Sequence, residues 1–211
     1  MRALAFCLAL ALPATASAET FTLSLGGGSI GTLDFTGADL RANVTDSPMG
    51  LANGTFAASS RAVQMADGRQ VTQYLSDAPR KGRTVSVLHD GGRAIETTVS
   101  PASDATDLSD AAAVPAGVID PVQAFGRMTS GGDCPGAFSF YDGRRVVTLS
   151  PTGRDGAGDT LVCRMSYRVT AGKGHLSPLN IKSAEVALHY AGGRMARLEI
   201  GSGPFTLYMS R

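Results

Sequence analysis

Most of this 211-residue chain alternates between apolar and polar residues with a period of two. In residues 161–169, for example, the apolar positions are Leu161, Cys163, Met165, Tyr167 and Val169. Because successive side chains of a β-strand point to opposite faces, this pattern places one face on a core and the other in water. About ten segments of this kind predict a mainly β protein built on an antiparallel sheet.

Turn signals that contain glycine separate these segments. Glycine accounts for 26 of the 211 residues, which is about 12% against roughly 7% in an average protein. Sequences that favour a positive φ occur at Asp67-Gly68, Asp90-Gly91-Gly92, Asp142-Gly143 and Gly192-Gly193. A flat sheet of this size would expose aggregation-prone edges, so we expect an antiparallel curved sheet or barrel that is closed or covered by another segment.

The alternation is interrupted before residue 129. Residues 101–118 are rich in Ala, Asp, Ser and Pro, which predicts an internal linker or crossing loop. Asp120-Pro121 then combines a preferred N-cap residue with a proline at the first helical position. This predicts one short helix near 120–128, whose apolar face consists of Val122, Phe125 and Met128.

The first 18 residues have the features of a secretory signal peptide. Arg2 precedes an apolar run from Ala3 to Leu12 that is too short to span a bilayer, and Ala16-Ser17-Ala18 fits a cleavage site. We therefore expect cleavage after Ala18 and a periplasmic protein in which residues 19–211 form a single β-rich domain. No later apolar run is long enough for a transmembrane segment in the mature chain.

The charge balance argues against one class of partner. The chain has 19 Lys and Arg residues against 18 Asp and Glu residues, and loss of Arg2 with the signal peptide leaves 18 of each. A mature chain without net charge is not expected to bind nucleic acid or an anionic membrane through bulk charge.

Two cysteines remain after removal of the signal peptide, Cys134 and Cys163. In an exported protein such a pair predicts a disulfide, with two unpaired thiols as the alternative. In a flat meander, the first and third strands lie about 9.6 Å apart, whereas a disulfide needs Cα atoms within about 7 Å. We therefore expect either that Cys134 lies in a segment that crosses over a strand end, or that the strand of Cys163 does not pair as in a simple meander.

Several motifs resemble catalytic or metal-binding patterns without the context that these require. Residues 26–31 read GGGSIG, which fits a dinucleotide loop and, around Ser29, a nucleophile elbow. Both motifs need a helix next, but the following residues alternate like a strand, so we interpret the run as a hairpin. The histidines His89, His175 and His189 lack metal-ligand spacing, and we predict no cofactor.

Two charged runs have simple interpretations. Asp104, Asp107 and Asp110 do not have the alternate spacing of a calcium loop, and we expect them to solvate the segment that contains them. The basic run Arg80-Lys81-Gly82-Arg83 is interpreted as an exposed turn, with a local contact to an anion as the alternative.

One set of residues resembles a known family. It consists of FYDGRR at 140–145, Asp120-Pro121 upstream, and Cys134 and Cys163 on either side. Over most of the mature chain it resembles DUF3108, a family of exported bacterial proteins of unknown function. The resemblance implies an envelope protein with a curved sheet or barrel, of which the lipoprotein-carrier fold is one form, and it implies no activity.

The resemblance transfers motif positions without assigning them a role. These positions are Asp120, Pro121, Tyr141, Asp142, Gly143, Arg144 and Arg145. Strand alternation after the turn predicts that one of the two arginines points outward and that the other reaches the rim of the inner face.

Three functions are compatible with these patterns. The favoured one is a non-enzymatic cell-envelope protein whose concave apolar face binds a lipid-like ligand or an envelope partner. The alternatives are a small envelope hydrolase, with Ser29 near a histidine and an aspartate, and an assembly or adaptor protein that pairs through an edge strand. The candidate lining residues, which a closed barrel would use as core instead, are Met165, Tyr167, Val169, Leu188, Met209 and Phe125.

Overall fold

Fourteen strands form one sheet in the computed structural model, which describes residues 18–47, 53–130, 133–175 and 180–211. The strand order is β7-β6-β5-β4-β3-β2-β1-β14-β13-β12-β11-β10-β9-β8. Neighbouring strands are antiparallel except for β8 and β9, which run parallel. The prediction of a mainly β protein with an antiparallel sheet is confirmed.

Most strands are six to eleven residues long, and only β8 and β9 are shorter. The stretch with the clearest alternation forms β11, one of the longest strands. The strand bounds are β1 (Glu19–Leu25), β2 (Gly28–Phe35), β3 (Asp39–Val44), β4 (Gly54–Gln64), β5 (Gln70–Ala78), β6 (Arg83–Asp90), β7 (Arg93–Ser100), β8 (Val118–Ile119), β9 (Phe138–Tyr141), β10 (Arg145–Asp155), β11 (Val162–Gly172), β12 (Ser183–Ala191), β13 (Arg194–Ser202) and β14 (Phe205–Ser210).

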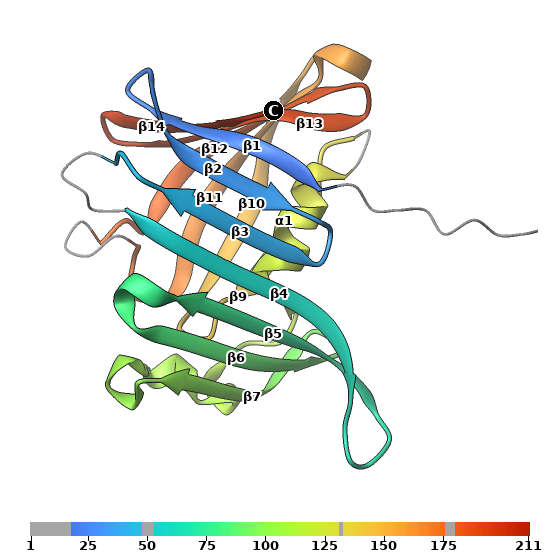
Figure 1. Ribbon diagram of the computed structural model, residues 1–211. Helices are drawn as coiled ribbons and strands as arrows, with labels where there is room; N and C mark the ends of the chain where they lie inside the picture. Colours follow the sequence, from blue (N-terminus) through green and yellow to red (C-terminus); the bar gives the residue numbers. More distant parts are fainter. Residues whose placement is uncertain (1–17, 48–52, 131–132, 176–179) are drawn as a thin grey trace, which may run out of the picture.

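The sheet curls into a nearly closed barrel (Figure 1). Its two outer strands, β7 and β8, approach each other where the carbonyl of Gly92 accepts hydrogen bonds from Gly117 N at 2.8 Å and Val118 N at 3.0 Å. The side chains of Thr97 and Tyr141 form a further hydrogen bond of 3.1 Å across this gap. The expected curved sheet or barrel is therefore confirmed, with closure by a few hydrogen bonds instead of a full strand ladder.

Residues 101–118 lie against the outer edge of β7. They contain three short 3-10 helices, η3 (Ala102–Asp104), η4 (Asp107–Ser109) and η5 (Ala111–Ala113), and each of them contacts β7. Leu108 is buried, and its carbonyl accepts a hydrogen bond from the Tyr141 hydroxyl. The segment therefore covers a strand edge that would otherwise expose unpaired backbone groups.

The one α-helix in the described residues, α1 (Pro121–Thr129), lies on the concave side of the sheet (Figure 1). This confirms the predicted helix, including Asp120 as its N-cap residue. The Phe125 ring packs edge-on against Phe21 and Phe35, with centroid distances of 5.8 and 5.0 Å. The helix therefore fills part of the barrel interior and completes a packed core.

This core contains four of the six residues that were expected to line a concave binding face. Met165, Leu188, Met209 and Phe125 are each at most 6% exposed. Only Tyr167 and Val169 remain partly buried at the edge of the core. For the first four residues the alternative interpretation as barrel core is correct, because α1 occupies the space that a ligand would need.

Asp120 is fully buried and fixes the start of α1. Its carboxylate accepts hydrogen bonds from Val122 N at 2.8 Å and Gln123 N at 2.9 Å, and from Ser60 Oγ at 2.7 Å. The first two bonds satisfy amide groups that helix geometry leaves without partners, and the third ties the helix to β4.

Replacing Asp120 with alanine should lower the free energy of unfolding by about 2 kcal/mol, because buried amide groups lose their partner. Urea denaturation followed by circular dichroism measures this loss. The control is Asp110→Ala, since Asp110 is exposed and caps η5 through Ala112 N at 2.9 Å. Asp110→Ala should lower the free energy of unfolding by less than about 1 kcal/mol. Equal losses of free energy for both variants would contradict the structural role of Asp120.

The predicted disulfide between Cys134 and Cys163 is formed, with Cα atoms 5.4 Å apart. Strand β10 pairs with both β9 and β11, as in a simple meander, although the β10–β11 pairing has two register shifts. Cys134 precedes β9, and the neighbouring Asp133 forms an ion pair of 2.6 Å with Arg154 of β10. Because Arg154 pairs with Cys163 in register, the segment of Cys134 crosses over β10 to reach β11, as the first alternative predicted.

The expected signal peptide falls almost entirely outside the described residues, which begin at Ala18. Among the residues that are described, no helix combines the length and the apolar character that crossing a membrane would require.

Candidate ligand-binding cavity

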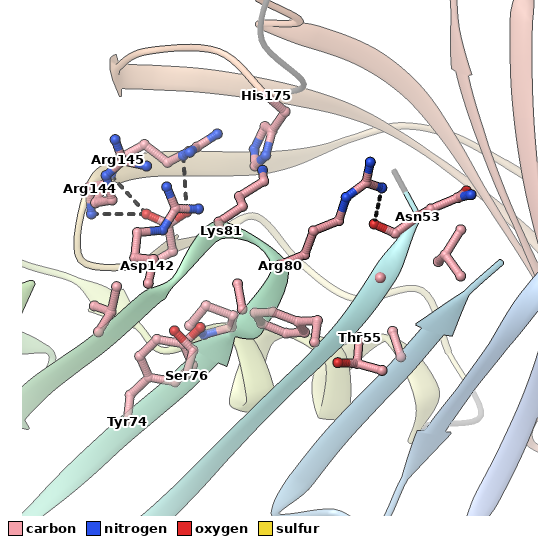
Figure 2. Close-up of a pocket in the computed structure, with 18 of the residues that line it drawn as sticks. Asn53, Thr55, Tyr74, Ser76, Arg80, Lys81, Asp142, Arg144, Arg145 and His175 are labelled. Atoms are coloured by element: carbon pink, nitrogen blue, oxygen red, sulfur yellow. Dashed lines mark hydrogen bonds and ion pairs between the residues drawn. The ribbon is translucent and has the colours of Figure 1, made fainter. Parts of the chain in front are cut away.

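A cavity of about 690 Å³ lies at one end of the barrel (Figure 2). Its walls come from the end of β3, the start of β4, the end of β5, the 3-10 helix η2 (Pro79–Lys81), the β9–β10 turn and His175. Pro121 also lines it, so the cavity reaches the start of α1. Its volume is within the range of about 300–1,000 Å³ that is typical of small-molecule sites.

One wall of the cavity is apolar. Phe56 lies two residues before the buried Ala58 on β4, so both point to the inner face of the barrel. Phe56 is 37% exposed whereas Ala58 is 5% exposed, which means that the inner face continues beyond the core into the open end. The apolar lining residues are Ala42, Val44, Phe56, Ala78, Val85 and Phe140.

Another part of the lining is cationic. It carries Arg80 and Lys81 from η2, Arg83 from the start of β6, Arg144 from the β9–β10 turn and Arg145 from the start of β10. Figure 2 shows Lys81 between Arg80 and the two turn arginines, with its amine directed toward His175.

Two carboxylates neutralise part of this charge. Arg83 forms an ion pair of 3.0 Å with Asp104, and Arg145 forms one of 3.0 Å with Asp142. Arg144 donates through Nε to the backbone carbonyl of Asp104 at 2.7 Å, which leaves its charge without a carboxylate partner in the described residues. Arg83 and Arg145 therefore have carboxylate partners, whereas Lys81 and Arg144 have none among the described residues.

The pKa values of three lining groups are lowered, first by burial and then by the neighbouring positive charges. The pKa of Lys81 is lowered by burial first and then by Arg83, Arg145 and Arg144. The pKa of Arg144 is lowered by burial and then by Arg83. Burial, followed by Arg145 and Lys81, lowers the pKa of His175 to about 4. A bound anion would relieve this mutual repulsion.

His175 is neutral at pH 7 and forms a hydrogen bond between its Nε2 and the hydroxyl of Tyr167. The unfolded chain has a histidine pKa of about 6.5, so below that pH the unfolded state binds a proton before the folded state does. Acid therefore destabilises the fold through this residue as the pH falls from 6.5 toward 4.

We expect His175→Gln to remove this part of the pH dependence, which amounts to about 3 kcal/mol between pH 7 and pH 4. Urea denaturation at the two pH values measures the difference for each protein. The control is His189→Gln, because His189 lies 3.1 Å from Glu199 on the neighbouring strand and not in the cavity. A pH dependence that His175→Gln leaves unchanged would count against a neutral buried His175.

The β9–β10 turn carries the motif that resembles DUF3108, and its geometry positions both Arg144 and Arg145. Asp142 Oδ1 accepts hydrogen bonds from Arg144 N at 3.0 Å and Arg145 N at 2.9 Å, and Gly143 has a φ of +89°. The expectation that one arginine points outward is wrong, since both line the cavity. Arg144 belongs to the turn and β10 begins only at Arg145, so strand alternation does not relate the two side chains.

The other motif positions have structural contacts. Asp120 caps α1. Tyr141 is fully buried beneath residues 101–118, and burial raises its pKa to about 12. Residues 80–82 of the basic run form an exposed turn as predicted, whereas Arg83 begins β6 and is partly buried. The run also contributes three side chains to the cavity.

The structure does not bring the hydrolase candidates together. The glycines at 26 and 27 form the β1–β2 hairpin as predicted, and Ser29 is exposed on β2. No hydrogen bond in the described part of the chain joins Ser29 to a histidine. His89 is buried on β6 with its ring edge-on to Tyr141 at 6.3 Å, and His189 contacts Glu199.

The geometry of the cavity is suited to a ligand with two unlike ends. Its lining combines apolar side chains from β3 and β4 with cationic side chains from η2 and the β9–β10 turn. Sequence reasoning identified both basic runs but did not place them together.

A comparison with protein-family models, curated proteins and solved structures found no match to this chain. The resemblance to DUF3108 therefore stays a prediction from the sequence.

Proposed function

We propose that the mature chain is a non-enzymatic protein of the periplasm that binds a lipid-like ligand in the open end of its barrel. The observation that carries this proposal is the cavity of about 690 Å³ whose apolar wall continues the barrel core. The signal-like N-terminus and the disulfide support an exported location. The resemblance to exported envelope proteins points the same way.

The energetics favour an acyl chain as the apolar part of the ligand. Phe56 is among the large apolar side chains that remain exposed, and it lies in the cavity. Each methylene group that is buried against such a surface contributes about 0.8 kcal/mol. Because α1 and the core side chains fill the rest of the barrel, the site accommodates part of a chain and not several whole chains.

The adaptor alternative receives less support from the contacts. An added strand would need a free sheet edge, but β7 is packed against η3, η4 and η5. A partner strand would have to displace this segment together with the Tyr141–Leu108 hydrogen bond.

The proposal is tested with mature protein, residues 19–211, and the neutral apolar fluorophore N-phenyl-1-naphthylamine. We expect saturable binding that Phe56→Asp weakens by about tenfold, because the substitution places a charge on the apolar wall. The control is Leu75→Asp, since Leu75 is 45% exposed and points to the outer face of β5. Its effect should stay within about twofold.

Two results would contradict lipid binding. One is the absence of saturable fluorophore binding to correctly folded wild-type protein. The other is an equal loss of binding in Phe56→Asp and Leu75→Asp. Mass spectrometry of the protein isolated from its own periplasm provides a second readout, in which we expect a retained amphiphile.

A further inference from the structure

Two cations of the cavity wall, Lys81 and Arg144, have no carboxylate partner among the described residues. Lys81 and Arg144 form no ion pair with any residue in the ranges that the structure describes, and Arg144 uses only Nε in its bond to the Asp104 carbonyl. The remaining N–H groups of the Arg144 guanidinium and the Lys81 amine are therefore donors available to a ligand. Both side chains line the same cavity.

The protein holds these two donors in place by different elements. Lys81 ends the 3-10 helix η2, which begins with Pro79 and is closed by Gly82 in a left-handed conformation with a φ of 56°. Arg144 is fixed by the Asx-type turn at Asp142 and by its bond to residue 104. Little backbone ordering is then required when an anion binds.

We propose that the cavity selects amphiphiles with a phosphate head group, which Lys81 and Arg144 contact while the apolar tail lies along Phe56. This inference rests on the proposed lipid-binding function and specifies the chemistry of the ligand. A phosphate offers several acceptor oxygens, which suits one compact ammonium group together with one guanidinium fork. Its negative charge also offsets the mutual repulsion of the cationic side chains that line the cavity.

The position of the two walls determines how the ligand is oriented. The head group lies beside η2 and the β9–β10 turn, and the tail lies along β3 and β4, where Val44 and Phe56 line the cavity. His175 is neutral at pH 7 and contributes no competing positive charge.

A matched pair of lipids separates the head group from the tail. Binding of 1-myristoyl lysophosphatidic acid, of the uncharged 1-monomyristoylglycerol, and of inorganic phosphate is measured by isothermal titration calorimetry below the aggregation concentration of each lipid. We expect wild-type protein to bind the phospholipid about tenfold or more tightly than the uncharged lipid. This preference should decrease as the salt concentration increases.

Variants of the two cations then assign the preference to the proposed contacts. Lys81→Gln and Arg144→Gln should each reduce the preference for the phospholipid by about tenfold while affinity for the uncharged lipid changes little. The control is Arg69→Gln, because Arg69 is exposed next to the β4–β5 turn and pairs with Asp67 and Asp90. Lys81→Gln keeps the test valid if the Arg144 variant is unstable, since Lys81 makes no bond that holds the turn.

The outcomes distinguish this inference from the proposed function. Equal affinity of wild-type protein for the two lipids overturns phosphate selection and leaves lipid binding intact. Failure of both lipids to bind overturns the proposed function as well. If inorganic phosphate binds as tightly as the phospholipid and Phe56→Asp has no effect on either, the source is free phosphate and the amphiphile is excluded.

Discussion

Replacing Gly143 with alanine should lower the free energy of unfolding by about 3 kcal/mol. Gly143 has a φ of +89°, which L-residues rarely adopt, so the substitution strains the backbone. A Cβ at this position would also lie 2.2 Å from Val85 Cγ1 and 3.4 Å from Val87 Cγ2. Both valines are at most 5% exposed, and a packed core accommodates added volume poorly.

The same substitution at Gly68 separates backbone strain from the clash. Gly68 has a φ of +85°, but its added Cβ would have no atom within 4 Å. Gly68→Ala should therefore cost only about 1 kcal/mol. Urea denaturation followed by far-ultraviolet circular dichroism compares the two variants, and similar losses would show that the β9–β10 turn does not pack against β6 as described.

A double-mutant cycle identifies the contact itself. Val85→Ala removes the methyl group that lies closest to the new Cβ, so it should relieve part of the loss caused by Gly143→Ala. A coupling energy near zero would contradict the contact between the turn and Val85.

The position of this turn also matters for ligand binding. Ser109 Oγ donates a hydrogen bond to the Gly143 carbonyl, and Thr106 Oγ1 donates one to the Arg144 carbonyl. Displacing the turn would move Arg144 away from the cavity.

The fold could be predicted from the sequence where local chemistry determines it. Period-two alternation in residues 161–169 identified β11, and the Asp120-Pro121 pair identified α1 to within one residue of each bound. Glycine turns such as Gly68 and Gly143 have the positive φ that their sequences favour. These features depend on residues close together in the chain, where propensity and hydrogen bonding act directly.

The position of α1 inside the barrel could not be predicted in this way. The sequence indicates an amphipathic helix, but which surface it covers depends on pairings between distant strands. Phe125 packs against Phe21 and Phe35, which precede it by about a hundred residues. For this reason Met165 and Leu188, which have the pattern of a concave binding face, belong to the core.

The cavity was not predicted from the sequence, because its lining residues come from turns that are far apart in the chain. The order of the strands was the one available signal. Lys81 and Arg144 come from turns that become neighbours only when the sheet curls and β7 approaches β8. In an antiparallel meander, however, alternate turns lie at the same end of the sheet. Counting strands would have placed the β3–β4, β5–β6 and β9–β10 turns together if the parallel strand β8 had been recognised.

Reduction of the Cys134–Cys163 disulfide should lower the free energy of unfolding by about 3.5 kcal/mol. The bond closes a loop with a sequence separation of 29 residues, and the entropy that such a loop removes from the unfolded chain corresponds to this value. Loss of the bond also releases the segment before β9, which the disulfide holds across β10. Reduction is preferred to substitution as the main test, because Cys163 is 1% exposed and a serine would bury a hydroxyl group.

The measurement compares urea denaturation of mature protein with and without dithiothreitol. The control is the double variant Cys134→Ala and Cys163→Ala, which should be destabilised by a similar amount and should not respond to the reductant. Thiol titration of unfolded wild-type protein should find no free thiol before reduction and two after it, because the mature chain contains two cysteines. Free thiols before reduction, or a stability that dithiothreitol leaves unchanged, would mean that barrel closure alone holds the segment of Cys134 against β11.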